Sequence, residues 1–191
     1  MNYEREKRLF DITLCAFLWG LLALPLLIIG IAVKLSSFGP IIFWSSRIGL
    51  HNRLFRMPKF RTMKVDTPIV ATHLLSLPDR HLTPVGKVLR KYSIDELPQF
   101  FSVLKGDMTF VGPRPALFNQ DDLIHLRTEK GVHRLVPGIT GWAQINGRDE
   151  LPIPAKVELD DFYLKHRCFA LDLRILFMTL FSVAGSKGIV H

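Results

Sequence analysis

The sequence predicts an α+β fold in two parts. Residues 1–36 are expected to form a re-entrant membrane hairpin, a helix-break-helix, and residues 37–191 a small, mainly helical domain with short strands and interfacial amphipathic helices. This prediction depends on an uncharged apolar segment near the start, two short strand-like stretches after it, and helix start and stop signals in the remainder. The 191 residues, of which 48% are hydrophobic, are enough for one domain with its own core.

The apolar segment runs from Ile12 to Val33 and contains 22 residues without a charge. A continuous helix of this length measures about 33 Å, which is enough to cross the hydrocarbon core of a bilayer. Pro25 removes a helical hydrogen bond within the segment and predicts a break there. Basic residues flank both ends, and such residues favour the cytoplasmic side. A re-entrant hairpin is therefore favoured over a straight anchor, and a cleaved signal peptide is least favoured because no A-x-A site follows.

Local signals place the first elements of the second part. Strands are expected over Ile41–Ser45 and Leu54–Thr62, followed by a loop with room for a short helix over residues 65–80. Thr83 and the proline after it predict the start of a helix that ends near residue 91.

A second helix start is expected at residue 93. Ser93 and Glu96 have the spacing of a capping box, which predicts a helix to Lys105 with Gly106 as its stop. Pro98 suits the first turn only, so Asp95 is an alternative cap.

The rest of the chain predicts two further helices with a turn-rich stretch between them. The helices are expected over Phe118–Lys130 and Phe162–Val183, and the turn-rich stretch over residues 137–148. The last helix suits either the membrane interface or packing on the core.

Charge and cysteine usage narrow the function classes. Residues 34–64 hold seven basic side chains and no acidic one, which suits anionic lipid headgroups or phosphorylated substrates. Nucleic-acid binding is disfavoured, because the chain has no zinc-finger spacing and no RNP-like aromatic motif. Cys15 and Cys168 form neither a disulfide framework nor a C-x-x-C pair, which fits a reducing compartment. The scattered histidines do not predict a zinc site.

Asp95 and Glu96 are the first candidates for chemistry. Neighbouring helical positions point about 100° apart, so these acids do not flank a bond as glycosidase carboxylates do. They suit a nucleophile beside a partner acid, or ligands for Mg²⁺ shared with substrate phosphates. The alternative is structural, because acids in a first helical turn also interact favourably with the helix dipole.

Basic residues in three other motifs could bind phosphate. Lys59 and Arg61 alternate with apolar residues, as on a phosphate-binding strand edge or on a solvated strand face. Arg114 lies between two prolines that stiffen the turn, which suits either phosphate binding or a structural turn. Arg148 ends a stretch of glycines, amides and a tryptophan that suits a nucleotide pocket.

Together these motifs closely resemble the small monotopic phosphoglycosyl transferases, a family of bacterial sugar transferases. The resemblance spans about residues 7 to 174 and keeps the motifs in order. They are the basic start, the proline-broken apolar segment, KFRTM at 59–63, SIDELPQ at 93–99, KGDMTFVGPRP at 105–115 and PGITGWAQINGR at 137–148. One departure concerns Leu24, because some members have a small polar residue before the proline. The chain is expected to be the minimal catalytic form, without an added multi-span domain.

The resemblance implies a reaction and roles for these residues. Such enzymes transfer a sugar 1-phosphate from a UDP-sugar to undecaprenyl phosphate with release of UMP and the participation of Mg²⁺. Asp95 would be the nucleophile and a metal ligand, and Glu96 its partner acid. The cations would contact phosphate and nucleotide: Lys59, Arg61, Arg114 and Arg148.

The resemblance also implies a location and a pathway step. The catalytic domain would lie on the cytoplasmic face of the bacterial inner membrane, in contact with membrane lipids. It would initiate assembly of an O-antigen, capsule, exopolysaccharide or glycoprotein glycan. The sugar, the pathway and any homo-oligomer stay open.

The competing hypothesis is a non-enzymatic membrane-surface module. In that case the basic block binds anionic lipid and the two acids only cap a helix. A polytopic phosphoglycosyl transferase is disfavoured, because one long apolar segment does not build a multi-span bundle.

Overall fold

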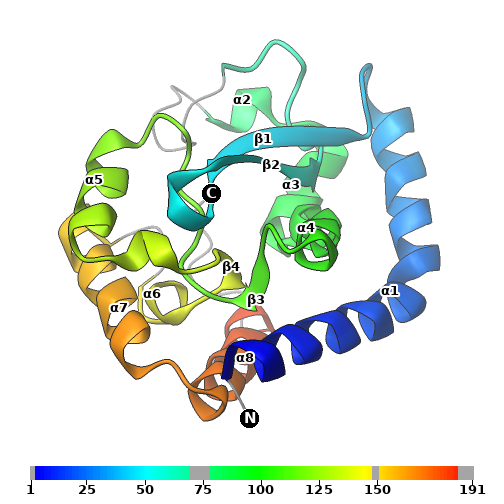
Figure 1. Cartoon of the computed structure of the whole chain (residues 1–191). Helices are drawn as coiled ribbons and strands as arrows, with labels where there is room; N and C mark the ends of the chain where they lie inside the picture. Colours follow the sequence, from blue (N-terminus) through cyan, green and yellow to red (C-terminus); the bar gives the residue numbers. More distant parts are fainter. Residues whose placement is uncertain (1–2, 69–77, 148–150, 185–191) are drawn as a thin grey trace.

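The computed structural model describes residues 3–68, 78–147 and 151–184 and shows a mainly helical α+β chain (Figure 1). The α-helices are α1 (Tyr3–Ser36), α2 (Pro78–His81), α3 (Pro84–Lys91), α4 (Phe100–Lys105), α5 (Asp121–Glu129), α6 (Trp142–Ile145), α7 (Ile153–His166) and α8 (Phe169–Ala184). The strands are β1 (Ile42–Ile48), β2 (Leu54–Phe60), β3 (Thr109–Val111) and β4 (Gly138–Thr140). Short 3₁₀ helices are η1 (Leu50–Asn52), η3 (Ile94–Gln99) and η4 (Val132–Arg134).

Helix α1 borders two sides of the molecule. It is helical from end to end and contains Pro25, so the predicted break in the helix is not seen. The ribbon instead bends partway along its length (Figure 1), and a proline inside a helix is a common cause of such a bend. By length and composition α1 could cross a membrane. Only 17% of the residues in its most apolar 18-residue stretch are buried within the structure. Most of its large apolar side chains are therefore not covered by the rest of the chain.

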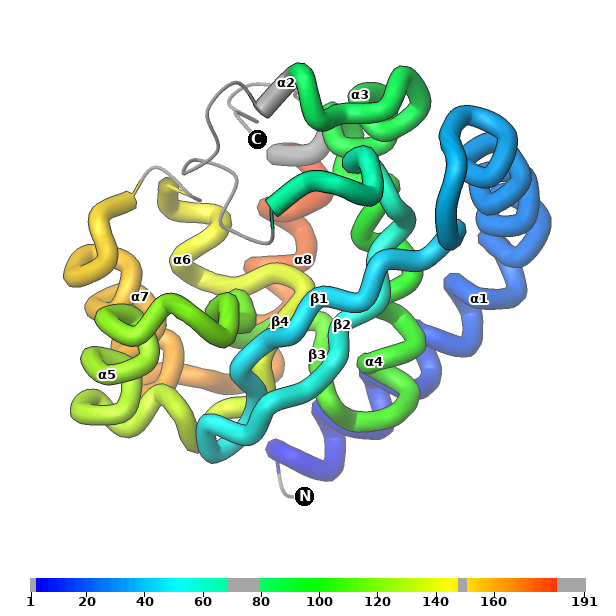
Figure 2. The backbone as a smooth tube through the Cα atoms, turned by 90° about the horizontal axis from the view of Figure 1, so that it is seen from above, coloured from blue at the N-terminus to red at the C-terminus, as the bar shows by residue number. Residues whose placement is uncertain are grey.

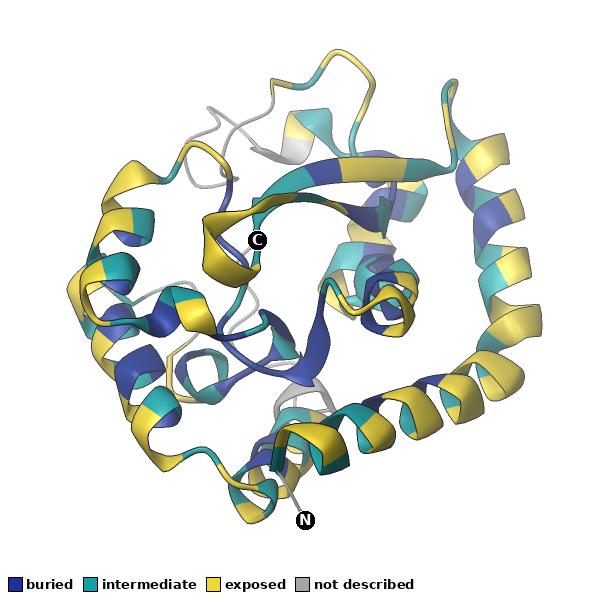
Figure 3. Cartoon of the chain, viewed as in Figure 1, coloured by how far each residue is buried: buried dark blue, intermediate teal, exposed yellow. Residues whose placement is uncertain are grey.

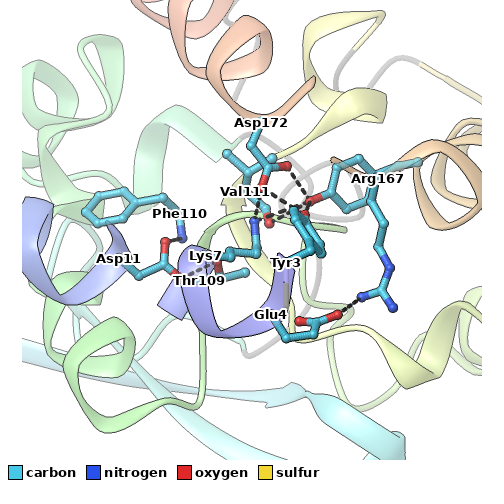
Figure 4. Close-up of polar contacts among 10 residues, drawn as sticks. Tyr3, Glu4, Lys7, Asp11, Thr109, Phe110, Val111, Arg167 and Asp172 are labelled. Carbon is cyan, nitrogen blue, oxygen red and sulfur yellow. Dashed lines mark hydrogen bonds and ion pairs between the residues drawn. The ribbon is translucent and has the colours of Figure 1, made fainter. Parts of the chain in front are cut away.

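The N-terminal half of α1 is fixed to the core by polar side chains (Figure 4). Asp11 accepts hydrogen bonds from the Thr109 hydroxyl at 2.6 Å and the Phe110 amide at 3.2 Å. Lys7 forms an ion pair with Asp172 of α8 at 2.6 Å. The Tyr163 hydroxyl of α7 donates to the same aspartate. These buried contacts connect the first helix to the last two.

Strands β1 and β2 form an antiparallel hairpin that pairs residue 42 with residue 60 and residue 48 with residue 54. Both predicted strands are confirmed, although β1 continues three residues further and β2 ends two residues earlier. The predicted α3 is also confirmed, because the Thr83 side chain accepts a hydrogen bond from the Gly86 amide at 2.9 Å. Gly86 lies so close to the Thr62 carbonyl that a Cβ atom would clash with it.

The prediction of a helix from Ser93 to Lys105 is wrong over its first half. Ser93 adopts a left-handed conformation with φ 54° and its side chain makes no cap hydrogen bond. The chain forms the 3₁₀ segment η3, which contains Pro98, and becomes α-helical only in α4. A proline lacks the amide that an α-helix needs at this position. The predicted stop is confirmed, because Gly106 has φ 91°.

The C-terminal part differs from the prediction in its boundaries. The helix expected over 118–130 is shorter, and the one expected over 162–183 is divided between α7 and α8. Within the turn-rich stretch, β4 pairs in parallel with β3, a pairing that sequence periodicity did not predict. This pairing brings residue 109 beside residue 138 and residue 111 beside residue 140.

The main core lies where α1, α4, β3, α7 and α8 meet, and it includes Val103, Met108 and Ile175. A second cluster joins Val33 of α1 to Phe60 and Leu89. Exposed residues follow the outer side of α1 in Figure 3, and Figure 2 shows α1 on the opposite side of the molecule from α5 and α7. The exposed apolar residues of α1 and α8 include Phe17, Leu21, Leu24, Leu27, Ile31, Phe177, Leu180 and Phe181.

Candidate active site

The candidate site forms where η3 lies against β2 and α3. The left-handed Ser93 redirects the chain after α3, and its carbonyl accepts a hydrogen bond from the Glu96 amide at 3.2 Å. This short 3₁₀ turn brings Asp95 to a buried position and directs Glu96 toward the strand. The two adjacent acids therefore have different surroundings.

Glu96 lies between two cations. Its Oε1 atom accepts from the Lys59 Nζ atom at 2.7 Å and from the Arg114 Nη2 atom at 2.7 Å. The second carboxylate oxygen lies 3.4 Å from Arg114 Nη1. Although burial opposes the charged form, these cations and their hydrogen bonds hold the pKa of Glu96 well below its usual range. Glu96 is therefore a carboxylate at neutral pH.

Asp95 makes no such pairs. Asp95 is 6% exposed, and its side chain forms no hydrogen bond or ion pair with any residue that the structure describes. Burial, with the nearby Glu96 charge, raises its pKa from 3.8 to about 6, against the opposing effect of Lys59 and Arg90. Neighbouring acids whose pKa values are pushed in opposite directions are typical of functional sites.

Lys59 and Arg114 come from separate elements. Lys59 lies on β2, and burial lowers its pKa whereas Glu96 raises it. Arg114 follows β3, and each proline beside it fixes its own φ angle. The structure thus brings together Asp95, Glu96, Lys59 and Arg114, four of the residues that the sequence predicted.

Arg61 and Pro25 lie outside this cluster. The Arg61 guanidinium donates to the Ser37 carbonyl at 2.8 Å and to the Phe38 carbonyl, so it connects β2 to the end of α1. Arg148 lies outside the described residues. Pro25 lies within α1. The phosphate and nucleotide roles of Arg61 and Arg148 stay predictions.

Sequence analysis missed Arg90 on α3. Its Nε atom donates to the Thr62 hydroxyl at 3.0 Å, and its charge lowers the pKa of Asp95. Basic residues are common in the last turn of a helix, so its position alone gives no signal of function. Its closeness to Asp95 in the sequence, five residues earlier at the end of the preceding helix, is the one feature that could have indicated it.

The donor set fits Mg²⁺ only if substrate oxygens complete its coordination. Among the described residues no group of three or more histidine, cysteine, aspartate or glutamate side chains could hold a metal. Asp95 offers a carboxylate that pairs with none of the residues the structure describes, and Glu96 is already bound to two cations. Mg²⁺ commonly binds through one or two carboxylates together with substrate phosphates and waters. The residues therefore fit a metal brought together with a phosphate substrate.

Comparison with known proteins gives the family. The family model described as "Bacterial sugar transferase" matches residues 2–186. The chain is 45% identical to the uncharacterized sugar transferase EpsL of Bacillus subtilis, over 96% of this chain and 89% of that protein. It is 42% identical to the undecaprenyl-phosphate glucose phosphotransferase of Komagataeibacter xylinus, over 92% of this chain and 35% of that protein.

A third relative adds a different sugar name. The chain is 37% identical to the UDP-N-acetylgalactosamine-undecaprenyl-phosphate N-acetylgalactosaminephosphotransferase of Aeromonas hydrophila, over 97% of this chain and 45% of that protein. The chain thus spans most of EpsL but less than half the length of the other two relatives. Because the family model and these relatives cover nearly the whole chain, the protein belongs to the bacterial sugar transferase family and is a transferase.

Proposed function

We propose that the protein transfers a sugar 1-phosphate from a UDP-sugar to undecaprenyl phosphate and so initiates polysaccharide synthesis. The names of its relatives contain the lipid acceptor and UDP-sugars. The observation that carries the mechanism is the environment of Asp95. This buried carboxylate has no hydrogen-bond or ion-pair partner among the described residues and lies beside the cation-bound Glu96. A carboxylate of this kind can act as a nucleophile toward phosphorus.

In the proposed first step, an Asp95 oxygen attacks the phosphorus bonded to the sugar. The bond between that phosphorus and the oxygen bridging the two phosphates breaks, and UMP leaves with the bridging oxygen. Asp95 then carries the sugar phosphate as an acyl phosphate. In the second step, an oxygen of undecaprenyl phosphate attacks the same phosphorus, and the Asp95 carboxylate leaves. The product is undecaprenyl diphosphate sugar.

The cations around the two acids suit this charge transfer. Lys59 and Arg114 would neutralise phosphate oxygens of the substrate. Their position beside the two acids supports this role, since both reach the same Glu96 oxygen at 2.7 Å. Glu96 would keep them in position, and Arg61 and Arg148 are the remaining candidates for phosphate and nucleotide contacts. Mg²⁺ held by Asp95 would supply additional positive charge to the phosphates.

We infer that the helix α1 enters one leaflet and returns to the same face, the cytoplasmic face of the inner membrane. Its bend, its exposed apolar side chains and the basic residues at both flanks support this placement. The apolar residues of α8 would contact the same leaflet. A site at the interface would be reached by both a soluble UDP-sugar and a lipid phosphate.

Cysteine labelling tests this topology. Arg5→Cys and Ser36→Cys, each in a background without Cys15 and Cys168, are expected to react with an impermeant maleimide only after spheroplasts are opened. Reaction of one site in intact spheroplasts and of the other only after opening would show a straight crossing and contradict the hairpin.

An assay of UMP release tests the reaction. Purified protein in nanodiscs is supplied with Mg²⁺, undecaprenyl phosphate and a panel of UDP-sugars. Asp95→Asn is expected to abolish UMP release and the covalent phosphosugar adduct in the intact mass. Asp121→Asn is the matched control, because Asp121 is an exposed first-turn acid of α5. Equal turnover by both variants would exclude Asp95 as the nucleophile. No UMP release by the parent chain with any UDP-sugar, and no covalent adduct, would favour the membrane-surface module, in which the acids only cap a helix.

A further inference from the structure

Each backbone carbonyl from Pro113 to Ala116 accepts a hydrogen bond from a donor outside this segment. These hydrogen bonds are Gly138 N to Pro113 O at 2.9 Å, Arg127 Nη1 to Arg114 O at 2.7 Å, Arg47 Nη1 to Pro115 O at 3.2 Å and Ile48 N to Ala116 O at 2.9 Å. The segment that carries the Arg114 guanidinium is therefore held from β4, α5 and β1. Its two prolines leave only two amides of its own.

Arg127 of α5 makes the contact to Arg114 itself. Its Nε and Nη2 atoms donate to one oxygen of Asp160 on α7, at 2.9 and 2.6 Å. Its remaining terminal nitrogen, Nη1, donates to the Arg114 carbonyl. Asp160 is 1% exposed and Arg127 7% exposed. This buried pair thus connects α7, through α5, to the backbone of the candidate active site.

Packing alone does not require a charged pair at this position. Burying two charges costs free energy, and replacing such a pair by apolar residues of similar size is often neutral or stabilising. The other Asp160 oxygen, Oδ1, is buried and has no hydrogen-bond partner in the described part of the chain. An apolar pair could fill the same space, but it could not donate to the Arg114 carbonyl.

We propose that Arg127, oriented by Asp160, is a positioning residue that fixes the Arg114 backbone so that its guanidinium reaches Glu96. This inference rests on the proposed transfer reaction. A residue before a proline is restricted to extended backbone, and the hydrogen bond to its carbonyl then fixes the orientation of the peptide plane. Arg114 Nη2 consequently lies 2.7 Å from Glu96 Oε1. A misplacement of about 1 Å in a catalytic group can cost about 100-fold in rate.

The test uses the double variant Arg127→Met/Asp160→Leu in the full chain. It removes both charges together, so neither is left buried alone, and it removes the donor to Arg114. We expect kcat/KM for UMP release to fall about 10- to 100-fold. The loss should be smaller when Arg114 is already changed to glutamine, because the two changes affect the same guanidinium.

Hydrogen exchange separates positioning from a general loss of structure. The double variant removes the donor to the Arg114 carbonyl, so the Arg114 and Ala116 amides should exchange faster, whereas the amides of the β1–β2 hairpin should exchange as in the parent. Tyr163→Phe is the control, because it removes buried hydrogen bonds near Asp172 and should leave the exchange of the Arg114 and Ala116 amides unchanged.

Each outcome decides the proposal. Activity within twofold of the parent, or a loss that is fully additive with that of Arg114→Gln, would overturn it. If the parent chain releases no UMP, the proposed function fails and hydrogen exchange decides the positioning role instead. Faster exchange of the Arg114 and Ala116 amides in the double variant would support that role, and unchanged exchange would overturn it.

Discussion

Replacing Asp95 by asparagine is expected to stabilise the folded chain at neutral pH. The pKa of Asp95 is 3.8 ordinarily and about 6 in the folded protein, mainly because of burial. The folded state thus binds this proton more tightly than the unfolded state. Ionisation of Asp95 therefore lowers the free energy of unfolding as pH rises from 3.8 to about 6, and this loss of stability is complete above that range. A shift of about two units corresponds to about 3 kcal/mol at most. Asparagine keeps the shape without the charge.

Thermal unfolding of the two proteins in one detergent measures this effect. A gain of about 1–3 kcal/mol raises the Tm of a chain of this size by several degrees. The difference should be largest at pH 7.5 and shrink toward pH 4, where Asp95 is protonated in the folded protein. Asp121→Asn, on an exposed first turn, should change Tm little. A lower Tm for Asp95→Asn at pH 7.5 would refute the reasoning, because loss of a helix cap would have that result.

Four further predictions concern the candidate site and the strand that leads to it. The kcat/KM profile should have an acid limb near pH 6, where Asp95 loses its proton. Arg114→Gln should move that limb to higher pH and Glu96→Gln to lower pH, since the two charges act on the Asp95 pKa in opposite directions; shifts of the same sign would contradict this. Chelation with EDTA should abolish UMP release, and Mg²⁺ should restore it, whereas activity in EDTA would exclude the metal role. Arg61→Met should lower stability by about 2–4 kcal/mol, seen as a lower Tm, because two carbonyls at the end of α1 lose their donor.

Local sequence signals predicted the elements whose causes are local. Thr83 before a proline and Gly106 after a helix identify boundaries that the structure confirms. The capping-box spacing of Ser93 and Glu96 gave a wrong helix start, because the Glu96 carboxylate binds Lys59 and Arg114 and does not cap the helix. A local spacing rule contains no information about Lys59, which lies on a strand 37 residues earlier in the chain.

The difference in surroundings between Asp95 and Glu96 shows why the properties of the site could not be predicted without the fold. In sequence the two acids are adjacent, and the motif alone does not indicate that their pKa values differ. The fold places two cations on Glu96 and none in hydrogen-bond contact with Asp95 among the described residues. One of these cations comes from β2 and the other from the segment after β3. Arg127 of α5, paired with Asp160 of α7, donates a hydrogen bond to the backbone of that segment. The chemical difference between neighbouring carboxylates therefore arises from long-range contacts, and variants far from Asp95 in sequence should change its titration.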